Sequence, residues 1–231
     1  KQQLDSYALQ LHQGLEQPLS IAVVPELLSA DWSEPLRVLA QEFPALEVEV
    51  RTLPQTDAVQ LLNQRAVHLA VLFERPVIHE REAFQEIGPE VLMVVTSAQH
   101  PLAKQPPHTL HHSDLAGTRQ IMVAGSAGAP DPRIQLGTQV WRVDNHLATL
   151  SLVQAGLGWA YLPSKLVQPL IKTGQLHALT FANMSNQLRL WVDVVWRLDT
   201  PLGLGAQRYI QLLQQSRPPT TRTARKPSKP D

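Results

Sequence analysis

The chain contains no cysteine, which excludes disulfides, thiolate metal ligands and cysteine nucleophiles. No apolar run approaches the length of about 20 residues that a membrane span needs. The first residues are not a signal peptide either, because their apolar side chains are spaced rather than contiguous. The 20 Lys and Arg residues equal the 20 Asp and Glu residues in number, so no overall basic field favours nucleic acid. These absences suit a cytoplasmic protein whose DNA contacts, if it makes any, lie outside this chain.

Catalytic and nucleotide-binding motifs are missing as well. The sequence has no G-x-S-x-G, no H-E-x-x-H and no P-loop. The GLG at 156–158 follows a predicted helix and precedes a strand, which is the reverse of the order in a dinucleotide fingerprint. The histidine-rich stretch 108–114 follows two prolines and is predicted to be a surface loop rather than a metal site. His68 interrupts an apolar strand and is expected to be structural. We therefore expect no enzyme activity, no cofactor and no metal.

The chain does contain strands and helices in regular alternation. Of its 231 residues 43% are hydrophobic and 17% are charged, which is enough for one large domain or two small ones with a real core. A first group has apolar or alternating strands at 19–24, 46–53 and 67–73, separated by helices that begin near Ser33 and at Thr56 or Asp57. Short joints between these elements predict right-handed crossovers and a parallel sheet.

A second group of elements follows, beginning with a strand that starts at Glu90. It has its own strand–helix–strand unit, and the chain closes with a long alternating strand and a last helix. Two such α/β groups imply two lobes with a crevice between them. In open α/β sheets, ligands bind beyond the carboxyl ends of the strands.

Polar or flexible residues follow the predicted strand ends of both groups. Helices that start there direct unpaired N–H groups and a partial positive charge at the crevice, which favours an anion. Capping alone explains any one of these residues, but several turns converge on one place. We expect ligand contacts from Pro25, Glu26, Leu27, Pro54, Phe73, Gly125, Ser126, Asp144, Asn145 and His146. Among the five tryptophans only Trp32, in the first strand–helix loop, is a candidate neighbour of the ligand.

The two ends of the chain differ from this pattern. Leu4, Ala8, Leu11 and Leu15 have the spacing of a coiled-coil seam, which fits either an amphipathic surface helix or the end of a dimerising helix. The chain begins at Lys1 without Met, so we expect it to be part of a longer protein. Residues 217–231 are rich in Pro, Thr and basic residues and are expected to form a disordered tail.

Several segments together resemble the effector-binding domain of the LysR-type transcriptional regulators. The most specific is LVQAGLGWAYLPSKLV at 152–167, which is similar to the family's lVaaGlGvallP segment. The stretches at 19–53, 60–73 and 94–103 are similar to other segments of that domain.

The resemblance implies an α/β, two-lobed periplasmic-binding-protein-like (type 2) fold, with two parallel or mixed sheets flanked by helices and an interlobe cleft. Residues 19–90 with 190–216 would form lobe I and 91–189 lobe II. Residues 1–17 would end a linker helix from a winged helix-turn-helix domain absent from this chain. A small-molecule effector in the cleft would change how a dimer or tetramer presents its DNA-binding domains, through unequal affinity for two arrangements. No membrane contact is implied.

Two positions depart from the family pattern. Pro25 and Glu26 stand where the family usually has Ser or Thr to hold the effector, and an ionised Glu26 would repel a simple carboxylate. The ligand is then expected to carry an amine, a hydroxyl or a basic group. His68 replaces the usual Asp, which changes local hydrogen bonding but not the fold.

Two other function classes share this architecture. An extracytoplasmic solute-binding protein of a transport system has the same lobes, and a leader sequence would distinguish it. A small-molecule lyase or deaminase would need a titrating base or a metal in the crevice, for which only His146, Glu26 and the cluster around His108 and His112 are available.

Overall fold

The computed structural model describes residues 14–15, 18–27, 32–126 and 131–215. Most of the predicted coiled-coil seam and all of the predicted tail lie outside these residues. Within them, none of the helices combines the length and apolarity needed to cross a bilayer.

The first group of elements agrees with the predicted alternation. It comprises β1 (Leu19–Val23), α2 (Glu34–Glu42), β2 (Val48–Thr52), α3 (Gln55–Asn63) and β3 (Leu69–Phe73). Strand β1 pairs in parallel with β2 on one side and with β3 on the other. Every residue of β1 and β3 is buried, as expected for parallel strands covered on both faces.

The start of α3 was predicted wrongly. Neither Thr56 nor Asp57 is its N-cap, because Pro54 holds that position. The Pro54 carbonyl already accepts hydrogen bonds from the N–H groups of Asp57 at 3.0 Å and Ala58 at 2.9 Å. The prediction followed the preference of Thr and Asp for N-caps, whereas the preceding proline begins the turn. As a result Gln55 and Thr56 lie in the first turn of the helix.

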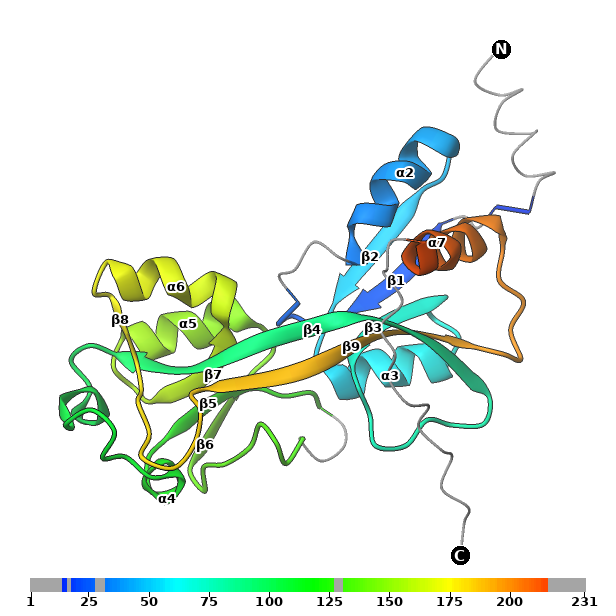
Figure 1. The fold of residues 1–231 in the computed structure, drawn as a ribbon. Coiled ribbons are helices and arrows are strands. Elements are labelled where there is room, and N and C mark those ends of the chain that lie inside the picture. Colours follow the sequence, from blue (N-terminus) through cyan, green and yellow to red (C-terminus); the bar gives the residue numbers. More distant parts are fainter. Residues whose placement is uncertain (1–13, 16–17, 28–31, 127–130, 216–231) are drawn as a thin grey trace, which may run out of the picture.

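The second group is built on two long strands. It comprises β4 (Glu82–Ser97), η2 (Pro101–Lys104), α4 (His112–Ala116), β5 (Gln120–Val123), β6 (Val140–Val143), α5 (His146–Gln154), β7 (Trp159–Pro163), α6 (Ser164–Lys172), β8 (Leu176–Ala178), β9 (Gln187–Arg197) and α7 (Leu204–Gln215). Strands β4 and β9 pair antiparallel along almost their whole length and run through both halves of the molecule (Figure 1). The hydrogen-bonded order is therefore continuous, β2-β1-β3-β9-β4-β7-β5-β6, with β8 also paired to β4.

Strand β4 begins eight residues before the predicted start at Glu90. Its first half contains Glu82, whose buried carboxylate lies 2.5 Å from a guanidinium nitrogen of Arg75. A register irregularity lies between Glu86 and Gly88. Because of the buried Glu82 and the bulge, the first half of β4 lacks a regular alternation of apolar and polar residues. That alternation is what identifies the second half of the strand in the sequence.

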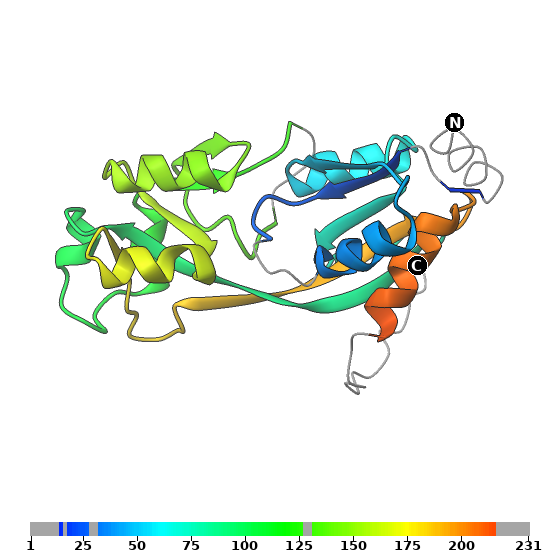
Figure 2. The ribbon, with the colours of Figure 1, turned by 90° about the horizontal axis from the view of Figure 1, so that it is seen from above.

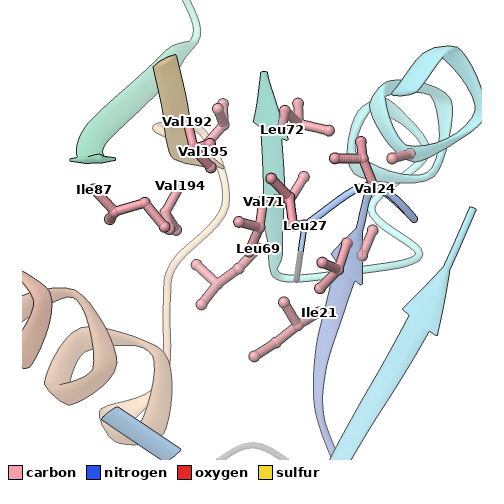
Figure 3. Packing of buried hydrophobic residues seen from close by; sticks show 14 of the residues in the cluster. Ile21, Val24, Leu27, Leu69, Val71, Leu72, Ile87, Val192, Val194 and Val195 are labelled. Carbon is pink, nitrogen blue, oxygen red and sulfur yellow. The ribbon is translucent and has the colours of Figure 1, made fainter. Parts of the chain in front are cut away.

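Helices cover both faces of the sheet in each half. In the half that contains β1, β2 and β3, α3 lies on one face and α2 and α7 on the other (Figure 2). One hydrophobic cluster fills this half, and Figure 3 shows Ile21, Val71 and Val194 within it. In the other half, Val94 and Val95 of β4 point into two different clusters on opposite faces. Each half therefore has its own core, and β4 and β9 connect them.

Candidate functional site

A cavity of about 830 Å³ lies where the two halves meet. Its wall is formed by residues that follow the carboxyl ends of three strands: Glu26 after β1, Glu74 after β3, and Gly125 with Ser126 after β5. These ends were expected to converge because ligand sites in α/β sheets form there. Much of the remaining wall is apolar and includes Pro54, Phe73, Pro76, Met122, Pro132 and Ile134.

Five of the ten predicted ligand residues line the cavity: Glu26, Pro54, Phe73, Gly125 and Ser126. Asp144 lines an adjacent smaller cavity of about 500 Å³, which shares Pro54, Gly125 and Ser126 with the larger one. The other four, Pro25, Leu27, Asn145 and His146, line neither of these cavities.

Packing and capping explain two of these four residues. Leu27 is 5% exposed and belongs to the core around β1 and β3 (Figure 3). Asn145 is the N-cap of α5, and its Oδ1 accepts a 2.8 Å hydrogen bond from the Ala148 N–H. Its Nδ2 donates to a carboxylate oxygen of Asp144 at 2.7 Å. The side chains of Leu27 and Asn145 are therefore engaged in packing and capping within the protein.

Pro25 and His146 form one contact between the two halves. The His146 ring hydrogen-bonds to the Pro25 backbone, which raises the pKa of the imidazole, but burial lowers it by more. The net effect is a lowered pKa, which favours the neutral ring. Its Nδ1 is buried and has no hydrogen-bond partner among the described residues. His146 thus joins α5 to the turn that carries Glu26.

Glu26 has the most unusual environment in the cavity wall. The residue keeps partial solvent exposure, but its carboxyl is surrounded by protein, and this burial raises the pKa to about 7. A hydrogen bond that the carboxyl accepts from the backbone N–H of Glu26 itself lowers the pKa by less. No Lys, Arg or His in the described residues forms an ion pair with Glu26. The stretches 28–31 and 127–130 also contain no basic residue.

A second contact between the halves involves Arg133, which the sequence did not single out. Its Nη1 donates to Oε1 of Glu74 at 3.0 Å, and its Nη2 donates to the Glu74 carbonyl at 3.0 Å. The same guanidinium pairs with the carboxylate of Asp131. Hydrogen bonds from Arg133 lower the pKa of Asp131 despite its burial. The only sequence signal was an Asp-Pro-Arg triplet in a loop, which does not reveal a partner 59 positions away.

A third contact joins Ser126 to α3. The Ser126 N–H and hydroxyl both donate to Oδ1 of Asp57 at 3.2 Å. The neighbouring Gly125 approaches α3 so closely that a Cβ there would lie 2.1 Å from the Thr56 hydroxyl oxygen. Only glycine fits this position without a shift of the surroundings.

Two further groups of the wall are unpaired within the described part of the chain. Arg142 of β6 lines both cavities and is exposed, with no hydrogen bond or ion pair to another described residue. The Thr56 hydroxyl oxygen is buried and has no partner there either. A buried unsatisfied polar atom is uncommon in proteins.

The remaining candidates have structural roles. Among the described residues no group of three His, Asp or Glu side chains could hold a metal ion. Asp114 accepts a 2.7 Å hydrogen bond from the His111 N–H in a capping box at α4. His68 Nδ1 meets the Ser20 N–H at 3.1 Å and the Ser20 hydroxyl at 2.8 Å. Trp32 does not line the cavity; it packs against the core, and its carbonyl accepts a hydrogen bond from the Tyr209 hydroxyl.

A family model described as the LysR substrate binding domain matches residues 12–218. The chain belongs to this family. The LysR domain seen here is 33% identical over 216 residues to AceR, a helix-turn-helix-type transcriptional regulator of Acinetobacter baumannii. That alignment covers 93% of this chain and 72% of AceR. The resemblance found in the sequence is thereby confirmed.

Solved LysR-type structures share the fold. The effector-binding domain of QuiR in complex with shikimate superposes with a TM-score of 0.64 at 11% identity, covering 87% of this chain and 96% of that one. Full-length LysG from Corynebacterium glutamicum with bound effector Arg superposes with a TM-score of 0.60 at 17% identity, covering 92% of this chain and 73% of LysG. The two-lobed periplasmic-binding-protein-like fold is therefore confirmed for this LysR domain.

Proposed function

We propose that this LysR domain senses a small-molecule effector in the cavity between its two lobes and so controls transcription. The observation that carries the proposal is a cavity of about 830 Å³ at the strand ends of both halves, a volume within the range of small-molecule sites. It contains carboxyl, hydroxyl and guanidinium groups on a largely apolar wall, which suits specific recognition of one compound.

A change in lobe orientation would carry the signal. Three contacts between the halves surround the cavity: His146 with Pro25, Arg133 with Glu74, and Ser126 with Asp57. An effector that binds one arrangement of the halves better than another shifts the equilibrium by that difference in affinity. We propose lobe limits of 19–90 with 190–216 for lobe I and 91–189 for lobe II, with the connection through β4 and β9.

The family favours a regulator over a solute-binding protein of a transport system and over an enzyme. The helix-turn-helix type of AceR supports a DNA-binding domain outside this 231-residue chain. The proposed full protein acts in the cytoplasm as a dimer or tetramer and contacts DNA through that domain. No cofactor or metal is part of the proposal.

A ligand screen tests the role of the cavity. The 231-residue chain would be screened for thermal stabilisation by diverse metabolites, since a ligand that binds only the native state raises the melting temperature. Each stabilising compound would then be titrated into Ala124→Leu, which fills part of the cavity wall. Ala116→Leu in α4 is the matched control, because Ala116 does not line the cavity.

We expect Ala124→Leu to lose the stabilisation and Ala116→Leu to keep it. A screen in which no compound stabilises the chain would contradict the proposal. So would compounds that stabilise Ala124→Leu as much as the unmodified chain.

A further inference from the structure

Charge on the cavity wall points to the class of effector. Three carboxyl groups line the cavity, those of Glu26, Glu74 and Asp131, against the guanidinium groups of Arg133 and Arg142. Arg133 pairs with both Glu74 and Asp131, so those three groups compensate one another largely within the protein. Glu26 and Arg142 are left without an ion-pair partner among the described residues.

These two remaining groups differ in their access to water. Arg142 lies on an exposed position of β6 at the boundary of the two cavities, where solvent screens its charge. Glu26 lies in the turn after β1, lines the cavity and is only partly exposed. A partly buried carboxylate is stabilised by a cation or by hydrogen-bond donors, and no residue in the described part of the chain supplies a cation. A ligand group in the cavity can supply it.

On the basis of the proposed function, we infer that the effector carries a protonated nitrogen, as an amine, amidine or guanidine, which pairs with Glu26. The rest of the effector is apolar and packs against the part of the wall formed by Pro54, Phe73 and Met122. Thr56, whose hydroxyl oxygen is buried and unpaired among the described residues, lines the same cavity. The first turn of α3, by contrast, would favour an anionic effector over a cationic one. An anionic compound is therefore compared with the amine.

The inference predicts a pH dependence of binding. Because burial holds the pKa of Glu26 near 7, the carboxyl is mostly protonated at about pH 6 and mostly ionised at about pH 8. Four other charged groups line the same cavity: Glu74, Asp131, Arg133 and Arg142. His146 is also close, because its ring hydrogen-bonds to the backbone of Pro25, the residue before Glu26. Burial lowers the pKa of His146, which favours its neutral form, and the arginines stay charged.

Three compounds of equal shape but different charge separate the possibilities: phenylbutylamine, phenylbutanol and phenylbutanoate. Their dissociation constants would be measured by calorimetry on the unmodified chain, on Glu26→Gln and on the matched control Glu47→Gln. Glu47 is exposed and does not line the cavity. Glu26→Gln keeps the size of the side chain and removes only its charge.

We expect phenylbutylamine to bind more tightly than the other two compounds, and about tenfold more tightly at pH 8 than at pH 6. Glu26→Gln should weaken amine binding about tenfold to a hundredfold and remove its pH dependence, whereas Glu47→Gln should change neither. Equal or tighter binding of the alcohol or the carboxylate would overturn the inference. No binding of the amine, or binding that Glu26→Gln leaves unchanged, would also overturn it.

Failure of this inference is distinguishable from failure of the proposed function. If the metabolite screen finds neutral or anionic compounds whose stabilisation Ala124→Leu removes, the cavity is still the effector site and only the ligand class is wrong. If the screen finds no compound of any charge, the proposed function fails as well.

Discussion

Arg133 and Glu74 lie 59 positions apart in the sequence, yet the guanidinium of Arg133 contacts both the carboxylate and the main-chain carbonyl of Glu74 at 3.0 Å. Arg133 belongs to the loop between β5 and β6, and Glu74 follows β3. The pair therefore connects the two lobes beside the cavity. The Glu74 side chain is only 11% exposed, so this contact has more energetic weight than a surface ion pair.

Arg133→Gln is expected to lower the free energy of unfolding by about 1 to 2 kcal/mol, because it removes the arginine partner of a nearly buried carboxylate. The loss is smaller than for a fully buried pair because Arg133 is partly exposed. Urea unfolding measures the change. Arg37→Gln is the matched control: its pair with Glu34 is exposed on both sides, and we expect a change within about 0.5 kcal/mol. Equal losses in the two variants would show that the Arg133 contact has no special weight.

Gly125→Ala is expected to separate the lobes or to strain them. A Cβ at this position meets the Thr56 and Asp57 side chains at 2.1 and 2.7 Å, and overpacking of this kind costs about 1 to 3 kcal/mol. Urea unfolding and the radius of gyration from small-angle scattering measure the two effects. Gly117→Ala is the control, since nothing lies within 4 Å of its added Cβ. A Gly125→Ala variant as stable and as compact as Gly117→Ala would contradict the close approach of Gly125 to α3.

Glu26→Gln is expected to stabilise the ligand-free chain at neutral to alkaline pH. The pKa of Glu26 rises from 4.5 in an exposed carboxyl to about 7 in the fold, so the folded state holds this proton more tightly than the unfolded state. The penalty for ionising Glu26 is absent below about pH 4.5, grows as the pH rises to about 7, and is complete above that. Glutamine never ionises and avoids it.

Urea unfolding of both chains across this pH range measures the difference. We expect Glu26→Gln to be more stable by roughly 2 to 3 kcal/mol at pH 8 and about equal to the unmodified chain at pH 4. Glu47→Gln should show no such trend. A difference between Glu26→Gln and the unmodified chain that does not vary with pH would mean that burial does not shift the pKa of this carboxyl.

Local pattern accounts for half of the predicted site. Glu26, Phe73 and Gly125 each lie at or just after the end of a strand whose apolar run is visible in the sequence, and parallel strands of a sheet bring such ends together. The same reasoning included Leu27 and Asn145, whose side chains the fold uses for packing and capping. A residue next to a strand end can point into the cavity or away from it, and the one-dimensional pattern does not distinguish the two.

The sequence by itself determined the alternation of strands and helices, the family, and the presence of an acidic residue where a polar one is usual. These follow from periodicity and local motifs, which act over a few neighbouring residues. Only the tertiary structure decided that Arg133 reaches Glu74, that Gly125 packs against Thr56 and that no described residue forms an ion pair with Glu26. The first two contacts bring together segments more than 55 positions apart, one from each lobe. The way in which β4 and β9 join the lobes sets these contacts, and no local pattern does.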